Sequence, residues 1–162
     1  TPLMLQLMVV YFGPYYLFRI KVGSGYRLWA TFIGFVINYA AYFAEIYRSG
    51  IQSMPVGQYE AAQILGYSRF QTFFKIILPQ VIKRILPSVT NEVITLVKDT
   101  SLARAIALQE VIWAAESFMK GNQGISGLWW PLMFTAVYYL AFSAIVTMVL
   151  GRLEKKLDYF RV

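Results

Sequence analysis

Long uncharged stretches dominate the pattern of hydrophobic and polar positions along the chain. Residues 1–18, 28–44 and 128–151 contain no charged side chain, and these runs are 18, 17 and 24 residues long. A helix that crosses a bilayer needs about 17 to 25 predominantly apolar residues. Each run therefore predicts a membrane-spanning helix. The third is the clearest, because Trp129 and Trp130 stand where an interfacial aromatic belt would lie.

A fourth apolar region, residues 81–118, differs from these runs because charges interrupt it. The charged positions are Lys83, Arg84, Glu92, Lys98, Asp99, Arg104, Glu110 and Glu116. Charged side chains are rare on lipid-facing helix surfaces, so this region does not read as one plain span.

A broken helix fits the region better. We expect a helix over residues 81–97, a break at 98–101 and a second helix over 102–119, which Gly121 would end. Asp, Thr and Ser are preferred N-cap types, and the break offers Asp99, Thr100 and Ser101. Apolar residues at three- and four-residue spacing would give the second helix one apolar face: Ala105, Leu108, Ile112, Ala115 and Met119.

Between the second run and the broken helix lies a polar loop of residues 48–84. It contains a short helical pattern over residues 55–65, closed by Gly66, which is too short to cross a bilayer. No tandem repeat, low-complexity tract or flexible linker interrupts the chain, so we treat residues 1–162 as a single transmembrane domain.

Composition supports an integral membrane protein. Hydrophobic residues make up 58% of the 162 positions, aromatic residues 17% and charged residues only 14%, whereas soluble domains usually carry about 25% charged residues. There is no His and no Cys. This removes the usual general base, the thiolate nucleophile and the soft metal ligands, and it disfavours an enzyme.

The charge distribution predicts the orientation. The loop of residues 48–84 and the tail after Leu150 together hold nine basic residues, against five on the other side. Loops rich in Lys and Arg lie in the cytoplasm. We therefore place the loop and the C-terminus there, and we attribute the formal charge of +7 to this asymmetry rather than to binding of nucleic acid.

One motif in the loop is specific. Glu60-Ala61-Ala62 is followed after three residues by Gly66 and, after nine more, by residues 76–79 with the letters I-I-L-P. This resembles the signature E-A-A-x3-G-x9-I-x-L-P of bacterial ABC-importer permeases at every fixed position and both spacings. The resemblance implies that the loop couples transport to ATP hydrolysis in a partner subunit.

Three further stretches narrow the resemblance to permeases for polar amino acids. Residues 41–53 are similar to the family run A-Y-x-A-E-x-x-R-x-G-I-Q-S, residues 91–102 to N-E-x-x-x-x-x-K-D-T-S-L, and residues 1–6 to T-P-L-x-x-Q. The similarity covers essentially the whole chain. Family members carry another span ahead of the Thr-Pro pair, so we expect a span that precedes Thr1.

The resemblance implies an all-α, polytopic helical bundle like that of a type I ABC importer permease. About four spans would lie in this chain, the third of them broken, with a short cytoplasmic coupling helix. The chain would sit as a multi-pass protein in the bacterial inner membrane. It would translocate a polar amino acid with a second permease subunit, which is a copy or a paralogue, two ATPase subunits and an extracytoplasmic binding protein.

The residue types of the short helix suit docking to an ATPase. Ala61 and Ala62 would keep one face narrow enough to enter a groove, while Tyr59 and Leu65 would supply apolar anchors. Glu60 lies in the early turns, where the helix dipole favours an anion, and Gly66 permits the left-handed backbone that ends a helix. ATP and Mg²⁺ would bind to the partner, since the chain has no G-x-x-x-x-G-K-[ST] motif and needs no cofactor of its own.

The broken helix is the best candidate for the substrate path. Lys98 can meet the carboxylate of an amino acid and Asp99 its ammonium group, while free N–H groups near Thr100 and Ser101 would favour an anion. Two turns earlier, Asn91 and Glu92 can line the same path. Alternatively, Lys98 and Asp99 pair with each other or with other spans to hold the break.

Other residues favour structural roles. Glu45 and Arg48 are three apart on one helix face and predict a salt bridge, and Trp129 with Trp130 predict an interfacial anchor. A channel or secondary transporter without an ATPase would also use charges within the membrane, but it has no use for a docking loop. A membrane-embedded enzyme is a weaker alternative, because no close Asp pair lies in the spans.

Overall fold

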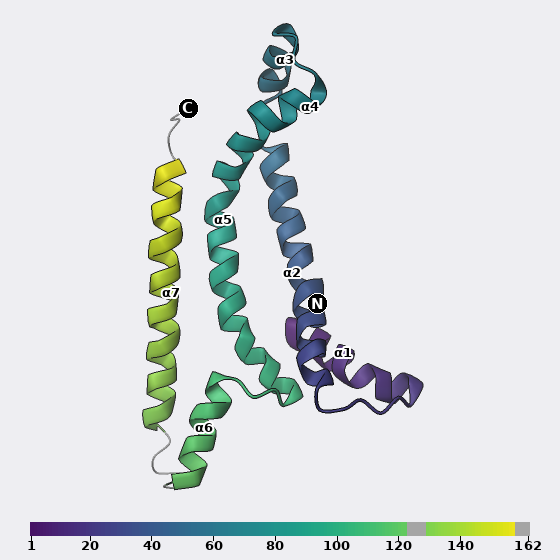
Figure 1. The fold of residues 1–162 in the computed structure, drawn as a ribbon, viewed down its shortest axis with the longest axis vertical. Helices are drawn as coiled ribbons and strands as arrows, with labels where there is room; N and C mark the ends of the chain where they lie inside the picture. Colours follow the sequence, from purple (N-terminus) through teal and green to yellow (C-terminus); the bar gives the residue numbers. More distant parts are fainter. Residues whose placement is uncertain (123–128, 158–162) are drawn as a thin grey trace. The chain divides into compact units, whose positions relative to one another are not determined.

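The computed structural model describes residues 1–122 and 129–157, and in these ranges it contains helices and no strand. In chain order the helices are α1 (Leu3–Phe18), α2 (Tyr26–Gln52), α3 (Val56–Ile64), α4 (Arg69–Gln71), the π-helix η1 (Thr72–Ile77), α5 (Leu78–Asp99), the 3₁₀ helix η2 (Thr100–Ile106), α6 (Val111–Asn122) and α7 (Trp129–Leu157) (Figure 1). The expected all-α class is confirmed.

The chain forms two compact units. Unit 1 comprises the described residues of Thr1–Ala40 and Ile94–Ile145, and unit 2 comprises those of Ala41–Val93 and Val146–Val162. Helices α2, α5 and α7 each contribute one part to each unit.

Two described helices are long and apolar enough to cross a membrane. They are Tyr26–Gln52, with 27 residues, and Trp129–Leu153, with 25 residues, and they contain the expected runs 28–44 and most of 128–151. Helix α1 has 16 residues, which gives it a length of about 24 Å against about 30 Å for the hydrocarbon core. The expected span over residues 1–18 is therefore a shorter apolar helix.

In unit 1, α1 packs against the first half of α2. Leu7 is fully buried, and a Cβ atom added at Gly34 would lie 2.7 Å from its Cδ2, so the small residue lets the helices approach closely. Gln6 Nε2 donates to Asn38 Oδ1 at 3.1 Å, and the Tyr26 hydroxyl donates to the carbonyl of Val10 at 3.1 Å. Hydrophobic contact and hydrogen bonds thus join the same two helices. Within α1 itself there is a proline, Pro14.

The broken helix is confirmed, but its second half begins later than expected. Helix α5 ends at Asp99 and continues as η2 to Ile106. Ala107 has a left-handed backbone with φ of 57°, and α6 starts only at Val111. Residues 102–106 are therefore helical but in the 3₁₀ form, and the prediction of a helix over 102–119 is wrong for residues 107–110.

Side-chain hydrogen bonds explain the shift. Thr100 Oγ1 donates to the carbonyl of Val97 and Ser101 Oγ donates to that of Lys98, so both hydroxyls satisfy carbonyls at the end of α5 instead of capping a new helix. Glu110 is the residue that caps α6. Its carboxylate accepts from the N–H groups of Ile112 and Trp113 at 2.8 and 2.7 Å.

Because α6 starts only at Val111, the predicted apolar face and the predicted end of the second helix also differ from the structure. Ala105 lies in η2 and Leu108 lies in the connection to α6, so neither shares a helix face with Ile112 and Ala115. The fifth position of the predicted face, Met119, falls within α6, and its side chain lies outside the described ones. Gly121 lies inside α6 and does not end it.

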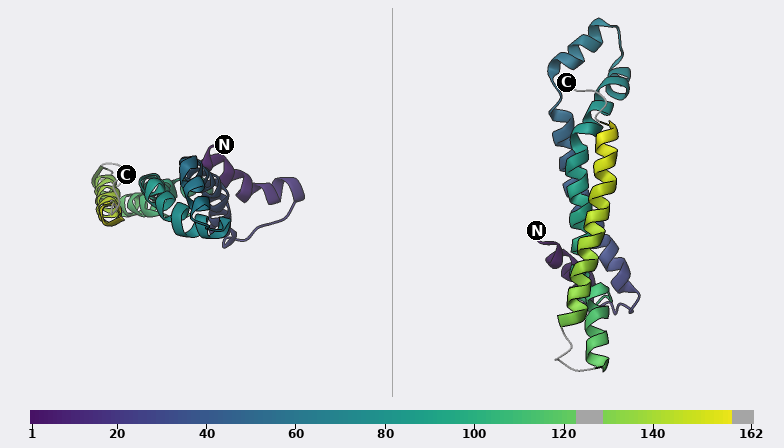
Figure 2. Two further views of the ribbon diagram at one scale, coloured as in Figure 1. Left: turned by 90° about the horizontal axis from the view of Figure 1, so that it is seen from above. Right: turned by 90° about the vertical axis from the view of Figure 1, so that its left-hand side faces the viewer.

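In unit 2, the short helix α3 lies at one end of the unit. Helices α3 and α4 lie beyond the adjacent ends of α2 and α5 (Figures 1 and 2). A buried cluster of Met54, Ile77 and Val81 lies beneath them, and Tyr59, Phe73, Ile76 and Ile85 pack against it. The short helix α4 begins with a capping box, in which the Ser68 side chain accepts from the backbone N–H of Gln71 and the Gln71 side chain accepts from that of Ser68.

We predict that Gly50→Ala destabilises unit 2. A Cβ atom at Gly50 would lie 2.2 Å from Ile85 Cγ2 and 3.2 Å from Val81 Cγ1. Such overpacking costs about 1–3 kcal/mol. The thermal unfolding temperature of the purified protein in detergent should therefore fall.

The matched control is Gly57→Ala in α3, where an added Cβ meets nothing within 4 Å. There the alanine should preserve or raise the unfolding temperature, because glycine costs about 0.5–1 kcal/mol in a helix relative to alanine. Equal unfolding temperatures for the two variants would contradict the close approach at Gly50.

Candidate functional site

The short helix α3 has well-defined ends. Pro55 precedes it with φ of −60° and ψ of 138°, a backbone that proline adopts without strain. At the other end Gly66 has φ of +76°, the Gly66 N–H donates to the carbonyl of Gln63, and the Tyr67 N–H donates to that of Ala62. These two bonds form a Schellman motif. The expected helix and the expected role of Gly66 in ending it are confirmed.

The inner face of α3 faces the chain's own core. Ala62 is 1% exposed, and Tyr59 is half-buried against the cluster of Met54, Ile77 and Val81. These two predicted coupling residues therefore hold α3 in place.

The outer face of α3 is available to another molecule. Glu60 and Ala61 are exposed, Ile64 is 86% exposed and Leu65 is 72% exposed. We call Glu60, Ala61, Ile64 and Leu65 the outer face of α3. Ile64 is not among the residues predicted from the sequence, although its position four residues after Glu60 places it on the same face of a helix.

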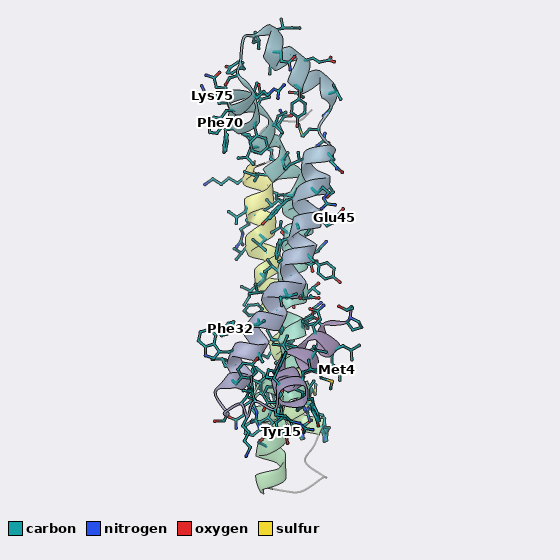
Figure 3. The ribbon with its side chains drawn as sticks, turned by 90° about the vertical axis from the view of Figure 1, so that its right-hand side faces the viewer. Met4, Tyr15, Phe32, Glu45, Phe70 and Lys75 are labelled. Atoms are coloured by element: carbon teal, nitrogen blue, oxygen red, sulfur yellow. The ribbon has the colours of Figure 1, made fainter. Side chains whose placement is uncertain are left out.

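Beside α3, aromatic and basic side chains extend from the segment that leads into α5. Figure 3 shows Phe70 and Lys75 on the same side of this segment. The rings of Phe70 and Phe74 are 4.4 Å apart between centroids, and Lys75 Nζ lies 5.9 Å from the centroid of the Tyr67 ring. The cation therefore lies within the range of a cation–π contact.

At the break after α5, Asp99 has a partner from another helix. The hydroxyl of Tyr39 in α2, a residue that is 4% exposed, donates to Asp99 Oδ2 at 2.8 Å. Lys98 is exposed, and among the described residues no ion pair joins it to Asp99. The alternative in which these two residues neutralise each other is thus not what the structure contains.

The helix start expected near Thr100 and Ser101, on which the predicted anion site depends, is not present there. Free N–H groups require the start of a helix, but α5 passes directly into η2 at these residues. Asn91, which is exposed, and Glu92, which is half-buried, lie in the part of α5 that belongs to unit 2.

Two ion pairs and one aromatic pair complete the polar and interfacial features. The expected salt bridge between Arg48 and Glu45 is present at 3.6 Å, with both side chains largely exposed; Figure 3 labels Glu45 on α2. Arg104 in η2 forms a two-pronged pair with Glu116 in α6. Trp129 and Trp130 are exposed at the start of α7, with ring centroids 4.1 Å apart.

Comparison with known proteins identifies the family of the chain. Residues 1–159 match the family described as "Binding-protein-dependent transport system inner membrane component". The chain belongs to this family.

Individual relatives are similar over most of the chain. The arginine transport system permease protein ArtQ of Bacillus subtilis is 36% identical over 157 residues, which are 97% of this chain and 69% of that protein. The octopine transport system permease protein OccM of Rhizobium radiobacter is 38% identical over 125 residues, which are 74% of this chain and 51% of that protein. A crystal structure of an amino acid ABC transporter with histidines matches with a TM-score of 0.81 at 30% identity, covering 96% of this chain and 70% of that one.

Membership of the family shows which subunit of a transporter this chain is. The chain is a permease of an ABC importer for polar amino acids, and it resides in the inner membrane. A permease of this kind is a transport subunit and not itself an enzyme. The alternative of a channel or secondary transporter without an ATPase is thereby set aside.

We predict that Tyr39→Phe lowers the stability of the permease. The change removes the hydroxyl that donates to Asp99 and leaves that carboxylate without its partner from α2. Hydrogen bonds to charged groups contribute about 1.5–3 kcal/mol, so the thermal unfolding temperature should drop clearly.

Tyr138→Phe provides the matched control, since Tyr138 is 54% exposed on α7. Its unfolding temperature should equal that of the wild type. A Tyr39→Phe protein as stable as the Tyr138→Phe protein would show that the hydroxyl contributes nothing to the break.

Proposed function

We propose that the permease binds an ABC ATPase subunit in the cytoplasm through the outer face of α3. One observation supports this most strongly: α3 is held by its inner face while Ile64 and Leu65, two large apolar side chains, remain 86% and 72% exposed beside Glu60. An apolar pair flanked by an anion, on a rigid short helix, suits a groove with an apolar floor and a basic rim. ATP and Mg²⁺ bind to the ATPase subunit. Hydrolysis of ATP in that subunit displaces α3.

The orientation proposed from the basic residues agrees with this use of α3. The loop of residues 48–84 and the tail after Leu150 lie in the cytoplasm, where Lys and Arg accumulate. The complete importer contains two permease subunits, which are identical or paralogous, two ATPase subunits and an extracytoplasmic amino-acid-binding protein. Alternating exposure of the path to the two sides of the bilayer follows from movement of the helices.

For the substrate, we propose that Lys98 and Asp99 meet the groups that all amino acids share. Lys98 is exposed and offers three donors to a carboxylate. Asp99 is held by Tyr39 through Oδ2, and its Oδ1 is the atom that would accept from an ammonium group. Asn91 and Glu92, in the preceding turns of α5, are proposed to line the same path. The relatives carry names with arginine, glutamine and octopine, which supports a nitrogen-rich polar amino acid or a derivative as the substrate class.

The docking proposal predicts that Glu60→Lys and Leu65→Asp, tested separately, each weaken recovery of the ATPase with the permease. Removing an anchor at the centre of an interface costs about 2 kcal/mol or more, which is at least tenfold in affinity. The measurement is the amount of ATPase that co-purifies in mild detergent per amount of permease, with the membrane level of the permease as reference.

Glu45→Lys is the control for the charge reversal, because Glu45 is also an exposed carboxylate but lies on α2, where it pairs with Arg48. It should retain the ATPase. Equal recovery with Glu60→Lys, Leu65→Asp and Glu45→Lys would refute docking through the outer face of α3.

The substrate proposal predicts that Lys98→Gln and Asp99→Asn raise the KM for uptake about tenfold or more, as expected when a hydrogen bond to a charged group is lost. Recovery of the ATPase should not change. Lys155→Gln, an exposed lysine of α7, should leave the KM unaltered. If Lys98→Gln and Asp99→Asn lower only the unfolding temperature and leave the KM as in the wild type, the two residues hold the break and do not contact substrate.

A further inference from the structure

The side chain of Gln80 connects α3 to α5. Its Nε2 donates to Gln58 Oε1 at 3.2 Å and to the carbonyl of Ile76 at 2.9 Å. Gln58 lies in the first turn of α3, and Gln80 lies in the first turn of α5. Both N–H donors of the Gln80 amide group are therefore bonded. One donates to a side chain of α3, and the other donates to a backbone carbonyl of η1, just before α5.

One turn further along α5, Arg84 makes a second connection. Its Nη1 donates to the carbonyl of Ser53, which lies between α2 and α3, and the Ser53 hydroxyl donates to the carbonyl of Gly50 at 2.7 Å. Gln80 and Arg84 are four residues apart, so they lie on the same face of α5. They contact the beginning of α3 and the segment that leads into it.

Apolar packing accompanies these polar connections. Ile77 and Val81 are buried with Met54, the residue just before Pro55. Apolar contacts exclude water but are non-directional, so they resist separation better than they resist sliding. Hydrogen bonds have defined distances and angles, and they fix the relative register of two helices.

We infer that Gln80 is a positioning residue that makes α3 and the first turns of α5 move as one body during transport. The inference rests on the proposed role of α3 in docking the ATPase. A displacement of α3 then passes through the Gln58–Gln80 hydrogen bond into α5, the helix that continues to Lys98 and Asp99. Without this bond, α3 can follow the ATPase while α5 lags behind, and ATP is hydrolysed without transport.

The test uses the complete importer, with permease, ATPase and binding protein, reconstituted in lipid vesicles. ATP hydrolysis and uptake are measured in the same vesicles for Gln80→Leu, Gln58→Leu and the matched control Gln52→Leu. Gln52 is exposed at the end of α2 and takes part in neither connection. For Gln80→Leu and Gln58→Leu, the number of ATP molecules hydrolysed per substrate transported should rise about three- to tenfold, the range expected for one lost hydrogen bond. The control should keep the wild-type ratio.

A cross-link provides the second arm. The sequence has no cysteine, so Gln58→Cys with Gln80→Cys gives it one pair of thiols, which a short bifunctional thiol reagent can join. Before the reaction this protein should show the raised ratio of ATP to substrate, and joining the thiols should restore the wild-type ratio. A merely structural role of Gln80 would not produce this recovery.

The contrary results separate the two proposals. If cross-linking stops both transport and hydrolysis, α3 must slide against α5 and the inference is overturned. A wild-type ratio in Gln80→Leu, or loss of the ATPase from that variant alone, also overturns it. Failure of the wild type and of Gln52→Leu to retain an ATPase would instead overturn the docking proposal.

Discussion

The packing of Tyr59 and Ala62 against the rest of unit 2 is the contact on which the functional surface depends. Helix α3 has nine residues, and isolated helices shorter than about 12–15 residues are marginal in water. Its persistence therefore comes from the cluster of Met54, Ile77 and Val81, which lies under its inner face. Because that face is held by the chain itself, the outer face can be apolar and exposed without loss of the helix.

The polar groups at the break after α5 are stabilised by hydrogen bonds rather than by apolar packing. A charged carboxylate in a membrane protein raises the free energy of the folded state unless other groups pair with it. The Tyr39 hydroxyl provides one for Asp99, and the hydroxyls of Thr100 and Ser101 satisfy carbonyls of α5. Side-chain hydroxyls thus serve polar groups on both sides of the point where the helix geometry changes from α to 3₁₀.

The sequence predicts local features of this fold well and non-local ones poorly. The ends of α3 and the Glu45–Arg48 pair depend on residues within a few positions of each other, and both expectations are confirmed. The predicted start of the second helix is wrong because Thr100 and Ser101 can either cap a new helix or bond back to the preceding one, and the residue types do not distinguish these choices. The Gln58–Gln80 and Tyr39–Asp99 bonds join residues 22 and 60 positions apart, and no periodicity in the sequence indicates them.

The hydrogen bond from Tyr26 to Val10 has a consequence for how the chain assembles. Pro14 lies inside α1 four residues after Val10 and has no N–H, so it cannot supply the bond that the Val10 carbonyl would normally receive within the helix. The hydroxyl of Tyr26, from α2, occupies that place. In a bilayer an unsatisfied carbonyl costs several kcal/mol, by the order of magnitude expected for backbone polar groups in lipid. Helix α1 therefore reaches its fully bonded state only after α2 has arrived beside it, which makes insertion of these two helices a joint event.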